Sequence, residues 1–293
     1  MDGPPLIFDH ALADTRRRRA LGMAVAGADF LYRAVAEDIA DRLGAVKRRF
    51  ALGVEIGSPV PVLAATGRVD RVVRLDRLAE TGADVVGDAE LLPFAPESLE
   101  LAVSVLTLHA ANDLPGALAQ MRRALKPDGL FLAALFGGDT LVELREALAT
   151  AEAEVTGGAA PRVAPFTDVR TAGSLLQRAG FALPVTDQDR HTVRYHSALH
   201  LMRDLRAMGM TNVLHERDRR PLGRAVLARA IAIYGERFAD ADGRVRATFE
   251  VISLSGWAPH ESQQQPLRPG SARIRLADAL GTRERPAGEK AGG

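Results

Sequence analysis

Short apolar runs alternate with more polar stretches through the first half of the chain. Residues 50–57 form an apolar run that ends at Gly57, and residues 69–76 form a second that ends at Asp76. Both are typical of strands, because they are short and bounded by turn residues. The intervening residues 60–66 are apolar and are entered through two prolines, which suit the first turn of a helix. This pattern predicts a compact βαβ unit.

The same alternation continues toward the middle of the chain. Strands are predicted over residues 83–88, 99–109 and 130–136, and a helix over 114–125 that Asp113 can cap. Strands that alternate with helices indicate an α/β fold, built on a mainly parallel sheet covered on both faces. Ligands of such sheets bind beyond the carboxyl ends of the strands.

The second half is richer in helices. We predict helices over residues 141–155 (capped by Asp139 or Thr140), around Leu175 after Asp168, over 198–208 and over 224–238, and a strand over 247–254. No internal repeat is visible. Residues 281–293 are polar and glycine-rich, and we expect them to fray.

Composition excludes several classes of protein. The 38 Lys plus Arg balance 37 Asp plus Glu, so bulk positive charge does not hold this chain on nucleic acid. Cysteine is absent, which removes disulfides, thiolate nucleophiles and thiolate metal sites. His191, His196 and His200 lie close in sequence, but no third ligand stands at zincin spacing, so we predict no metal site there.

The location of the protein is predicted from its apolar runs. None approaches the roughly 18 residues that span a bilayer, and the first residues lack an apolar signal core, so we expect a cytoplasmic protein. The basic cluster Arg16 to Arg19 lies in a predicted helix and could face anionic lipid at the inner face of the membrane, a partner, or water. A solvated face is the favoured interpretation.

Two strand-end carboxylates are candidate ligand contacts. Asp76 follows Gly57 by about 20 residues, the relation in which a carboxylate accepts from both hydroxyls of a ribose. An exposed aspartate in a turn is an equally good reading. Asp88 could accept from an adenine amino group while Ala89 packs on the ring, although such a residue more often serves a turn.

The loop after Gly57 departs from a typical cofactor loop. Such loops contain several glycines, so that backbone N–H groups approach the ligand closely. Here Ser58-Pro59-Val60-Pro61 follows, and neither proline has an N–H to donate. We therefore predict weak binding of any nucleotide-type cofactor at this loop.

Several blocks between Gly87 and Leu144 carry a family resemblance. They are Asp88-Ala89-Glu90-Leu91-Leu92-Pro93-Phe94, Ser104-Val105-Leu106-Thr107-Leu108-His109, Asn112-Asp113-Leu114-Pro115 and Leu125-Lys126-Pro127-Asp128-Gly129. The chain resembles the class I S-adenosylmethionine-dependent methyltransferases of the group that contains the malonyl-carrier-protein O-methyltransferase. The resemblance implies a Rossmann-like seven-stranded fold with a terminal antiparallel hairpin and an inserted helical lid.

A narrower resemblance covers residues from about Leu6 to Arg275. It rests on Ile7-Phe8-Asp9, Phe136-Gly137-Gly138-Asp139-Thr140-Leu141, Gly180-Phe181, Leu201-Met202-Arg203-Asp204-Leu205, Met208-Gly209 with Thr211-Asn212, and Gly256-Trp257 with Glu261-Ser262-Gln263. These blocks resemble bacterial relatives of the mitochondrial complex I assembly factor, a family described as hydroxylating an arginine of an iron–sulfur subunit of the respiratory NADH dehydrogenase.

The resemblance also implies an organisation and a site. We expect an N-terminal helical segment (1–45), a core of the adenosylmethionine-binding type (46–137), a lid with the C-terminal part of the same fold (138–280) and a flexible tail (281–293). The implied walls of an S-adenosylmethionine pocket are Glu55, Gly57, Asp76, Asp88, Ala89 and Leu106. Within this fold His109 is expected at the mouth of the cleft, as the candidate catalytic residue.

Three hypotheses for the function follow. The first is an arginine hydroxylase acting in assembly of the NADH dehydrogenase, which takes a subunit of that enzyme as its protein partner. The second is a carboxyl O-methyltransferase with a carrier-bound or small substrate. The third is a non-catalytic assembly chaperone, which the proline-containing loop favours over the second. The blocks at residues 136–141, 201–212 and 256–263 hold few residues suited to acid–base chemistry, so we predict that the second half binds a protein.

Overall fold

The computed structural model describes residues 6–264 and 275–283. The chain divides into two units after Pro259. The first contains the sheet and the helices that cover it. In the second, residues 261–263 form a turn in which Ser262 N donates to His260 Nδ1, and α8 (Leu276–Ala279) is a single short helix. The predicted tail lies outside the described residues beyond position 283.

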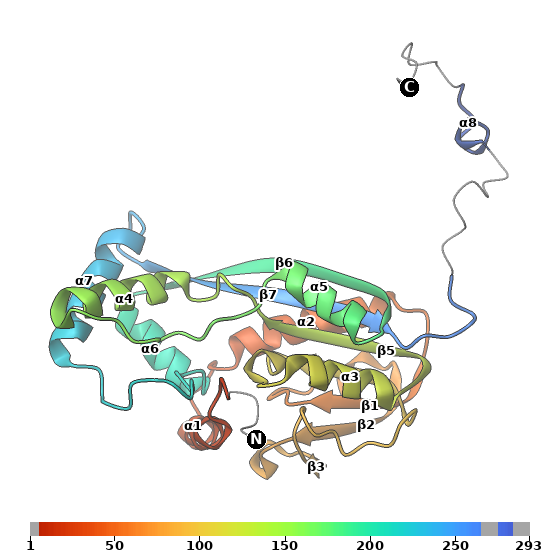
Figure 1. Cartoon of the computed structure of the whole chain (residues 1–293), viewed down its shortest axis with the longest axis horizontal. Helices are drawn as coiled ribbons and strands as arrows, with labels where there is room; N and C mark the ends of the chain where they lie inside the picture. The colour runs from red at the N-terminus through yellow and green to blue at the C-terminus, as the bar shows by residue number, and fades with distance from the viewer. Residues whose placement is uncertain (1–5, 265–274, 284–293) are drawn as a thin grey trace, which may run out of the picture. The chain divides into compact units, whose positions relative to one another are not determined.

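The first unit is built on a seven-stranded sheet in the order β3-β2-β1-β4-β5-β7-β6 (Figure 1). The strands are β1 (Phe50–Ile56), β2 (Val69–Asp76), β3 (Val85–Val86), β4 (Leu99–Val105), β5 (Leu125–Phe136), β6 (Ala182–Tyr195) and β7 (Val245–Trp257). The first five run parallel, whereas β7 is antiparallel to both β5 and β6. The predicted seven-stranded fold with a terminal antiparallel strand pair is confirmed, but residues 196–244, which include two helices, connect β6 to β7 in place of the short turn of a hairpin.

Helices cover both faces of the sheet, which is the reason that its central strands are apolar on both sides. The helices are α1 (His10–Met23), α2 (Phe30–Ala45), α3 (Leu114–Ala124), α4 (Val142–Thr156), α5 (Val169–Arg178), α6 (Ala198–Ala207) and α7 (Arg224–Phe238). One core cluster joins α2, α4, α6 and α7 to one face, around Ile39, Leu101 and Ile233. The other joins α3 and α5 to the opposite face, around Leu118, Phe131 and Leu176 (Figure 1).

The prediction of a helix over residues 60–66, between β1 and β2, is wrong because the helix that forms there is shorter. Only a four-residue 3-10 helix forms there, η1 (Leu63–Thr66). Two prolines precede it, and the N–H groups of Val62 and Leu63 donate to the Glu55 side chain instead of entering a helix. The crossover is therefore shortened to a loop and one turn.

Two further differences concern β5 and α4. Leu99 pairs with Leu125 but Leu101 pairs with Leu130, so the predicted turn at residues 126–129 lies within the span of β5 as an irregularity in its pairing with β4. At the start of α4, neither Asp139 nor Thr140 caps the helix. The N-cap residue is Leu141 at φ 55°, and the Thr140 hydroxyl donates to the Glu250 carbonyl of β7.

The edge strand β6 was not located from the sequence. Its outward positions carry polar and charged side chains, and among the described strands β7 is its one neighbour. Polar residues on an edge strand weaken the apolar signal that reveals a buried strand. The strand lies inside residues 138–280, the segment expected to hold a lid and the C-terminal part of the same fold, and it belongs to the sheet.

Candidate functional site

A cavity of about 520 Å³ lies beyond the carboxyl ends of the parallel strands. Its walls include Gly57 after β1, Asp76 at the end of β2, Leu106 after β4 and Phe136 at the end of β5. Helix α1 contributes Arg17 to the same cavity. The sheet edge where ligands were expected to bind is therefore the place where the structure forms a pocket.

Most of the residues predicted for the pocket line this cavity, namely Gly57, Asp76, Asp88, Ala89, Leu106 and His109. Glu55 does not. Its side chain is 1% exposed and lies under the loop, where Oε1 accepts from Val62 N at 2.8 Å and Leu63 N at 2.5 Å. Glu55 holds the loop in place and contributes no atom to the cavity wall.

The backbone of the loop after β1 offers few donors to a ligand. The Gly57 N–H donates to Leu75 O at 2.8 Å, as a continuation of the sheet. Pro59 and Pro61 have no N–H. The next two N–H groups are used by Glu55. Of the seven residues from 57 to 63, only Ser58 and Val60 have an N–H group without an acceptor among the described residues.

Thr107 packs directly on Gly57. A Cβ added at Gly57 would lie 2.3 Å from Thr107 Cγ2, and the residue has φ +67°, so only glycine fits. The Thr107 hydroxyl donates to the Gly57 carbonyl at 2.9 Å. In a typical cofactor loop, the space over the glycine lets the cofactor approach the backbone closely. Here the side chain of Thr107 fills that space.

The Asp76 carboxylate is also engaged. Arg17 of α1 binds it through two parallel hydrogen bonds, Nη1 to Oδ1 at 3.0 Å and Nη2 to Oδ2 at 2.7 Å. Leu78 N donates to Oδ1 as well, and the Asp76 side chain is 4% exposed. Burial alone would lower the pKa of Arg17, but the hydrogen bonds and charge of Asp76 outweigh it and raise the pKa of Arg17. Burial also raises the pKa of the adjacent Tyr32 to about 12.

Asp88 is also paired with an arginine, which it shares with Asp14. Arg77 Nη1 donates to Asp88 Oδ2 at 2.5 Å, and its Nη2 donates to Asp14 of α1 at 2.9 Å. The pKa of Arg77 is raised because these two carboxylates outweigh the effect of its burial, which lowers it. Both carboxylates expected to contact a cofactor therefore carry an arginine of the protein itself.

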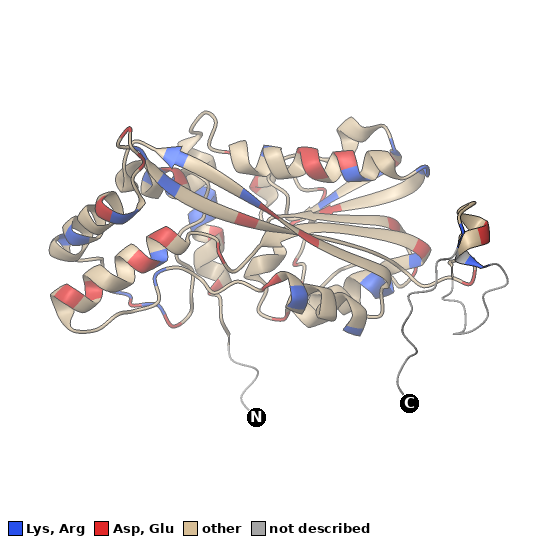
Figure 2. Cartoon of the chain, turned by 90° about the horizontal axis from the view of Figure 1, so that it is seen from above, with Lys and Arg blue, Asp and Glu red and all other residues tan. Residues whose placement is uncertain are grey.

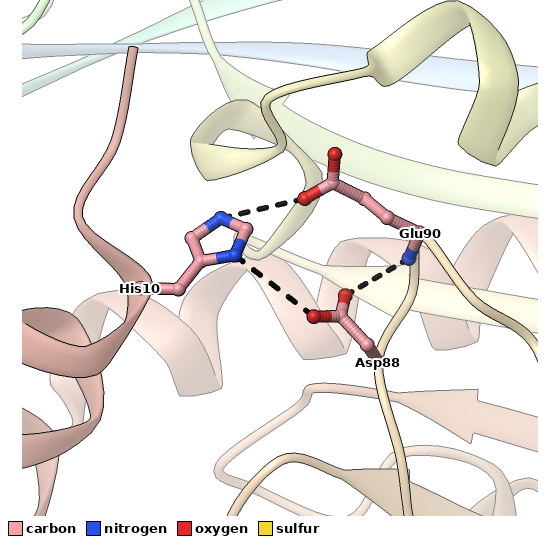
Figure 3. Close-up of side chains that lie close together, drawn as sticks. All are labelled: His10, Asp88 and Glu90. Atoms are coloured by element: carbon pink, nitrogen blue, oxygen red, sulfur yellow. Dashed lines mark hydrogen bonds and ion pairs between the residues drawn. The ribbon is translucent and has the colours of Figure 1, made fainter. Parts of the chain in front are cut away.

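His10, Asp88 and Glu90 form a cluster at the edge of the cavity (Figure 3). His10 Nε2 lies 3.3 Å from Glu90 Oε2, and Nδ1 lies 3.9 Å from Asp88 Oδ2. Among the described residues this is the group whose ligand atoms could hold a metal ion. Arg77 already occupies Asp88 Oδ2, and its positive charge opposes the binding of a metal cation at that oxygen.

His109 is half-buried in an aromatic wall. Its ring centroid lies 4.6 Å from that of Phe136 and 5.5 Å from that of Phe166. Its Nδ1 is fully buried and has no hydrogen-bond partner among the described residues. Burial lowers the pKa of His109 to about 3, so the imidazole stays neutral near pH 7. A histidine so weakly basic is poorly suited to act as a general base.

The interpretation of Arg16 to Arg19 as a solvated face is wrong for two of the four residues. Arg17 points into the cavity, and Arg16 donates to the Asn212 carbonyl. Arg18 pairs with Glu80 at the surface. In the cartoon of Figure 2, acidic and basic residues alternate along the helices and the long strand pair. No local pattern marks which arginine of a basic run turns inward, so the sequence did not indicate Arg17.

In the described part of the chain, the three histidines considered as metal ligands do not belong to a group whose ligand atoms could hold an ion together. The rings of His196 and His200 lie 5.6 Å apart, and His200 Nδ1 lies 2.9 Å from the Ser197 hydroxyl at the start of α6. His191 lies on β6 opposite Phe249. Parts of the blocks that suggested a protein-binding half also line the cavity, through Met202 and Asn212.

The fold and the pocket define a protein of the class I methyltransferase fold. Residues 52–133 match the family model "Methyltransferase domain". The YcgJ protein of Bacillus subtilis shares the fold, with a TM-score of 0.51 and 14% identity over 76% of this chain and 99% of that one. No helix in the described part of the chain is long and apolar enough to cross a membrane.

More similar relatives narrow the family. The chain is 39% identical over 263 residues to "Arginine-hydroxylase NDUFAF5, mitochondrial" of Danio rerio, which covers 85% of this chain and 82% of that protein. Identity to the Homo sapiens protein is 38%, over 85% and 76%. A "Malonyl-[acyl-carrier protein] O-methyltransferase" of Methylovorus sp. is 35% identical, over 78% and 70%. The chain belongs to the methyltransferase-fold family that includes the arginine hydroxylase NDUFAF5.

Proposed function

We propose that this protein hydroxylates an arginine side chain of a subunit of the respiratory NADH dehydrogenase during assembly of that enzyme. The reaction needs an external oxidant of the class of dioxygen with a two-electron donor: one oxygen atom enters a bond to hydrogen of the side chain, and the other leaves as water. The observation that carries the proposal is the pairing of Arg17 with Asp76, because it places a guanidinium on the carboxylate where the fold would otherwise receive a ribose. The similarity to NDUFAF5 over 85% of the chain supports the same choice. The proposal includes a cytoplasmic location with peripheral contact at the inner face of the membrane.

S-adenosylmethionine does not fit this site in the manner expected of the fold. Its ribose would have to displace Arg17 from Asp76, and its adenine amino group would meet an Asp88 held by Arg77. The loop donors are largely used, and Thr107 covers Gly57. We therefore propose weak binding of S-adenosylmethionine, and no step of the proposed activity is derived from it.

The experiment is mass spectrometry of the assembled dehydrogenase from wild-type and deletion strains. An arginine that carries one additional oxygen atom in the wild type and lacks it in the deletion strain supports the proposal. The same arginine, unmodified in both strains, contradicts it.

A second candidate is an assembly chaperone without catalysis. The covered glycine loop and the weakly basic His109 favour it, because both remove groups that a methyltransferase or an acid–base catalyst would use. Affinity capture from respiring cells separates it from the first. Recovery of a dehydrogenase subunit without any arginine mass difference supports the chaperone, whereas recovery of acyl carrier protein with methyl transfer in vitro supports a carboxyl methyltransferase.

A further inference from the structure

Arg17 shows what the Asp76 carboxylate can recognise. Its guanidinium makes the two parallel hydrogen bonds that match both carboxylate oxygens, a geometry that an ammonium cannot reproduce. The pair lies in the wall of the cavity, with Asp76 buried and Arg17 26% exposed. The subsite therefore matches a guanidinium, whose N–H groups lie in one plane and can donate to both carboxylate oxygens.

A ribose would compete for the same two oxygens, because its vicinal hydroxyls also donate in pairs. The remainder of a nucleoside site is missing, however. Gly57 N donates to Leu75 O, the prolines have no N–H, and Thr107 occupies the space above Gly57. The expected cofactor site thus keeps its carboxylate, Asp76, but lacks most of the free backbone N–H groups and the open space over Gly57.

The carboxylates that contact α1 suit a cation once α1 is away. They are Asp76, Asp88 and Glu90, with one guanidinium, that of Arg77, among them. Two further arginines, Arg162 and Arg206, line the cavity elsewhere. Around them the cavity has apolar and aromatic walls, including Leu106 and Phe136, along which an arginine stem can pack. An arginine side chain matches both features.

Helix α1 is held over the cavity mainly by polar contacts. None of its residues is buried. It is attached through Arg17 to Asp76, Asp14 to Arg77, Arg18 to Glu80 and His10 to Glu90. Elements with few buried apolar contacts open at low free energy, and partly exposed ion pairs add little to hold them. Phe8, just before α1, is buried and its N–H donates to Asn112, so α1 would move aside about this anchor to admit a basic segment of a partner.

We infer that Asp76 is the recognition carboxylate of an arginine-binding subsite, in which Arg17 holds the place of an arginine from the protein substrate. This inference rests on the proposed function and names the residue that reads its substrate side chain. Asp76 is then a specificity residue for guanidinium, reached when α1 moves aside.

Ligand-observed NMR titration of the full-length protein tests this directly. The probes are N-acetyl-arginine methylamide, its citrulline analogue, which has the same shape without the charge, and adenosine, which presents a ribose diol. The variants are Arg17→Ala, the double variant Arg17→Ala with Asp76→Asn, and Arg18→Ala as the matched control on the same helix. Circular dichroism checks that each is folded, and Arg17→Gln replaces Arg17→Ala if that variant is not.

We expect Arg17→Ala to bind the arginine probe roughly tenfold to a hundredfold more tightly than the wild type or Arg18→Ala does. The citrulline probe should bind at least roughly tenfold less well, and the double variant should lose the gain. The inference is overturned if arginine and citrulline bind alike, if Asp76→Asn changes nothing, if adenosine competes with the arginine probe and binds more tightly, or if no probe binds the folded variants.

The result is separable from the test of the proposed function. If the protein binds arginine selectively but the dehydrogenase gains no oxygen atom, the arginine subsite is supported and the hydroxylase function is contradicted. An oxygen gained without selective binding at Asp76 would leave the hydroxylase standing and remove the subsite.

Discussion

At the scale of single residues, the site is defined by carboxylates that are already paired. Asp76 and Asp88 stand where the fold was expected to contact a cofactor, and each accepts hydrogen bonds from an arginine of the same chain. A buried carboxylate without such a partner is costly, since burial disfavours the charged form. The pairing with Arg17 and Arg77 therefore both stabilises the pocket and decides what else can enter it.

The substitution Asp76→Asn should lower the free energy of unfolding by about 1 to 3 kcal/mol, because Arg17 would lose its charged partner while remaining mostly buried. Urea denaturation of the two proteins measures this. Glu80→Gln is the control, since its pair with Arg18 is about half exposed on both sides and should change stability by under about 1 kcal/mol. Equal losses in the two variants would show that the pair of Arg17 with Asp76 stabilises the fold no more than an exposed ion pair does.

His109 predicts a dependence of stability on pH. Its pKa is lowered to about 3 in the folded protein, so the folded state binds fewer protons than the unfolded state below the ordinary histidine value of about 6.5. The stabilisation from a neutral His109 is present above that value and is lost as pH falls, by up to about 1.4 kcal/mol per pH unit.

The variant His109→Phe keeps an aromatic ring between Phe136 and Phe166 and removes the titrating group. It should lose less stability than the wild type between pH 7 and about pH 5, by about 1 to 2 kcal/mol. Denaturation at both pH values checks this. His215→Ala, which removes an exposed histidine, should follow the wild-type profile. A His109→Phe profile parallel to the wild type would exclude the buried neutral imidazole.

At the scale of elements, two segments set the site: the shortened connection from β1 to β2 and the helix α1. The connection has only one 3-10 turn where a helix was predicted, and its backbone is tied to Glu55 and to β2. Helix α1 lies over the cavity without burying a residue. In the connection, the N–H groups of Gly57, Val62 and Leu63 donate to other groups of the protein, and α1 places a guanidinium on Asp76.

Gly57→Ala should destabilise the protein by about 2 to 4 kcal/mol, because the new methyl group would lie 2.3 Å from Thr107 at a positive φ. Gly67→Ala is a matched control: φ is +62° there, and the space around it is open. It carries the same backbone strain without the clash, so about 1 kcal/mol is expected. Thermal or urea unfolding of both variants separates strain from contact, and equal losses would argue against the packing of Thr107 on Gly57.

Hydrogen exchange should report the weak attachment of α1. We expect its amides to exchange faster than those of α2, which buries Leu31, Ile39 and Leu43, and to exchange faster still in about 0.5 M salt, where partly exposed ion pairs are screened. Mass spectrometry of deuterium uptake at low and high salt measures the difference. Protection of α1 equal to that of α2 and insensitive to salt would contradict the arrangement.

At the scale of the whole molecule, the sequence was most informative about the sheet. The strands ending near Gly57, Asp76 and Phe136 were predicted because buried parallel strands are short apolar runs between turn residues. The edge strand β6 was missed because its outward residues are polar. Family resemblance placed six residues that do line the cavity, but it could not indicate Arg17, since an ion pair between positions 17 and 76 leaves no local pattern.

The most direct measurement of the central claim is the mass of the modified arginine in the NADH dehydrogenase from a deletion strain that carries either Asp76→Asn or Glu80→Gln. Glu80→Gln changes a surface pair on the same side of the molecule and should restore the additional oxygen atom found with the wild-type protein. Asp76→Asn should leave that arginine without the oxygen, although the variant protein is folded and present at the wild-type level. A fully modified arginine with Asp76→Asn, or an arginine that lacks the oxygen even with the wild-type protein, would contradict the account.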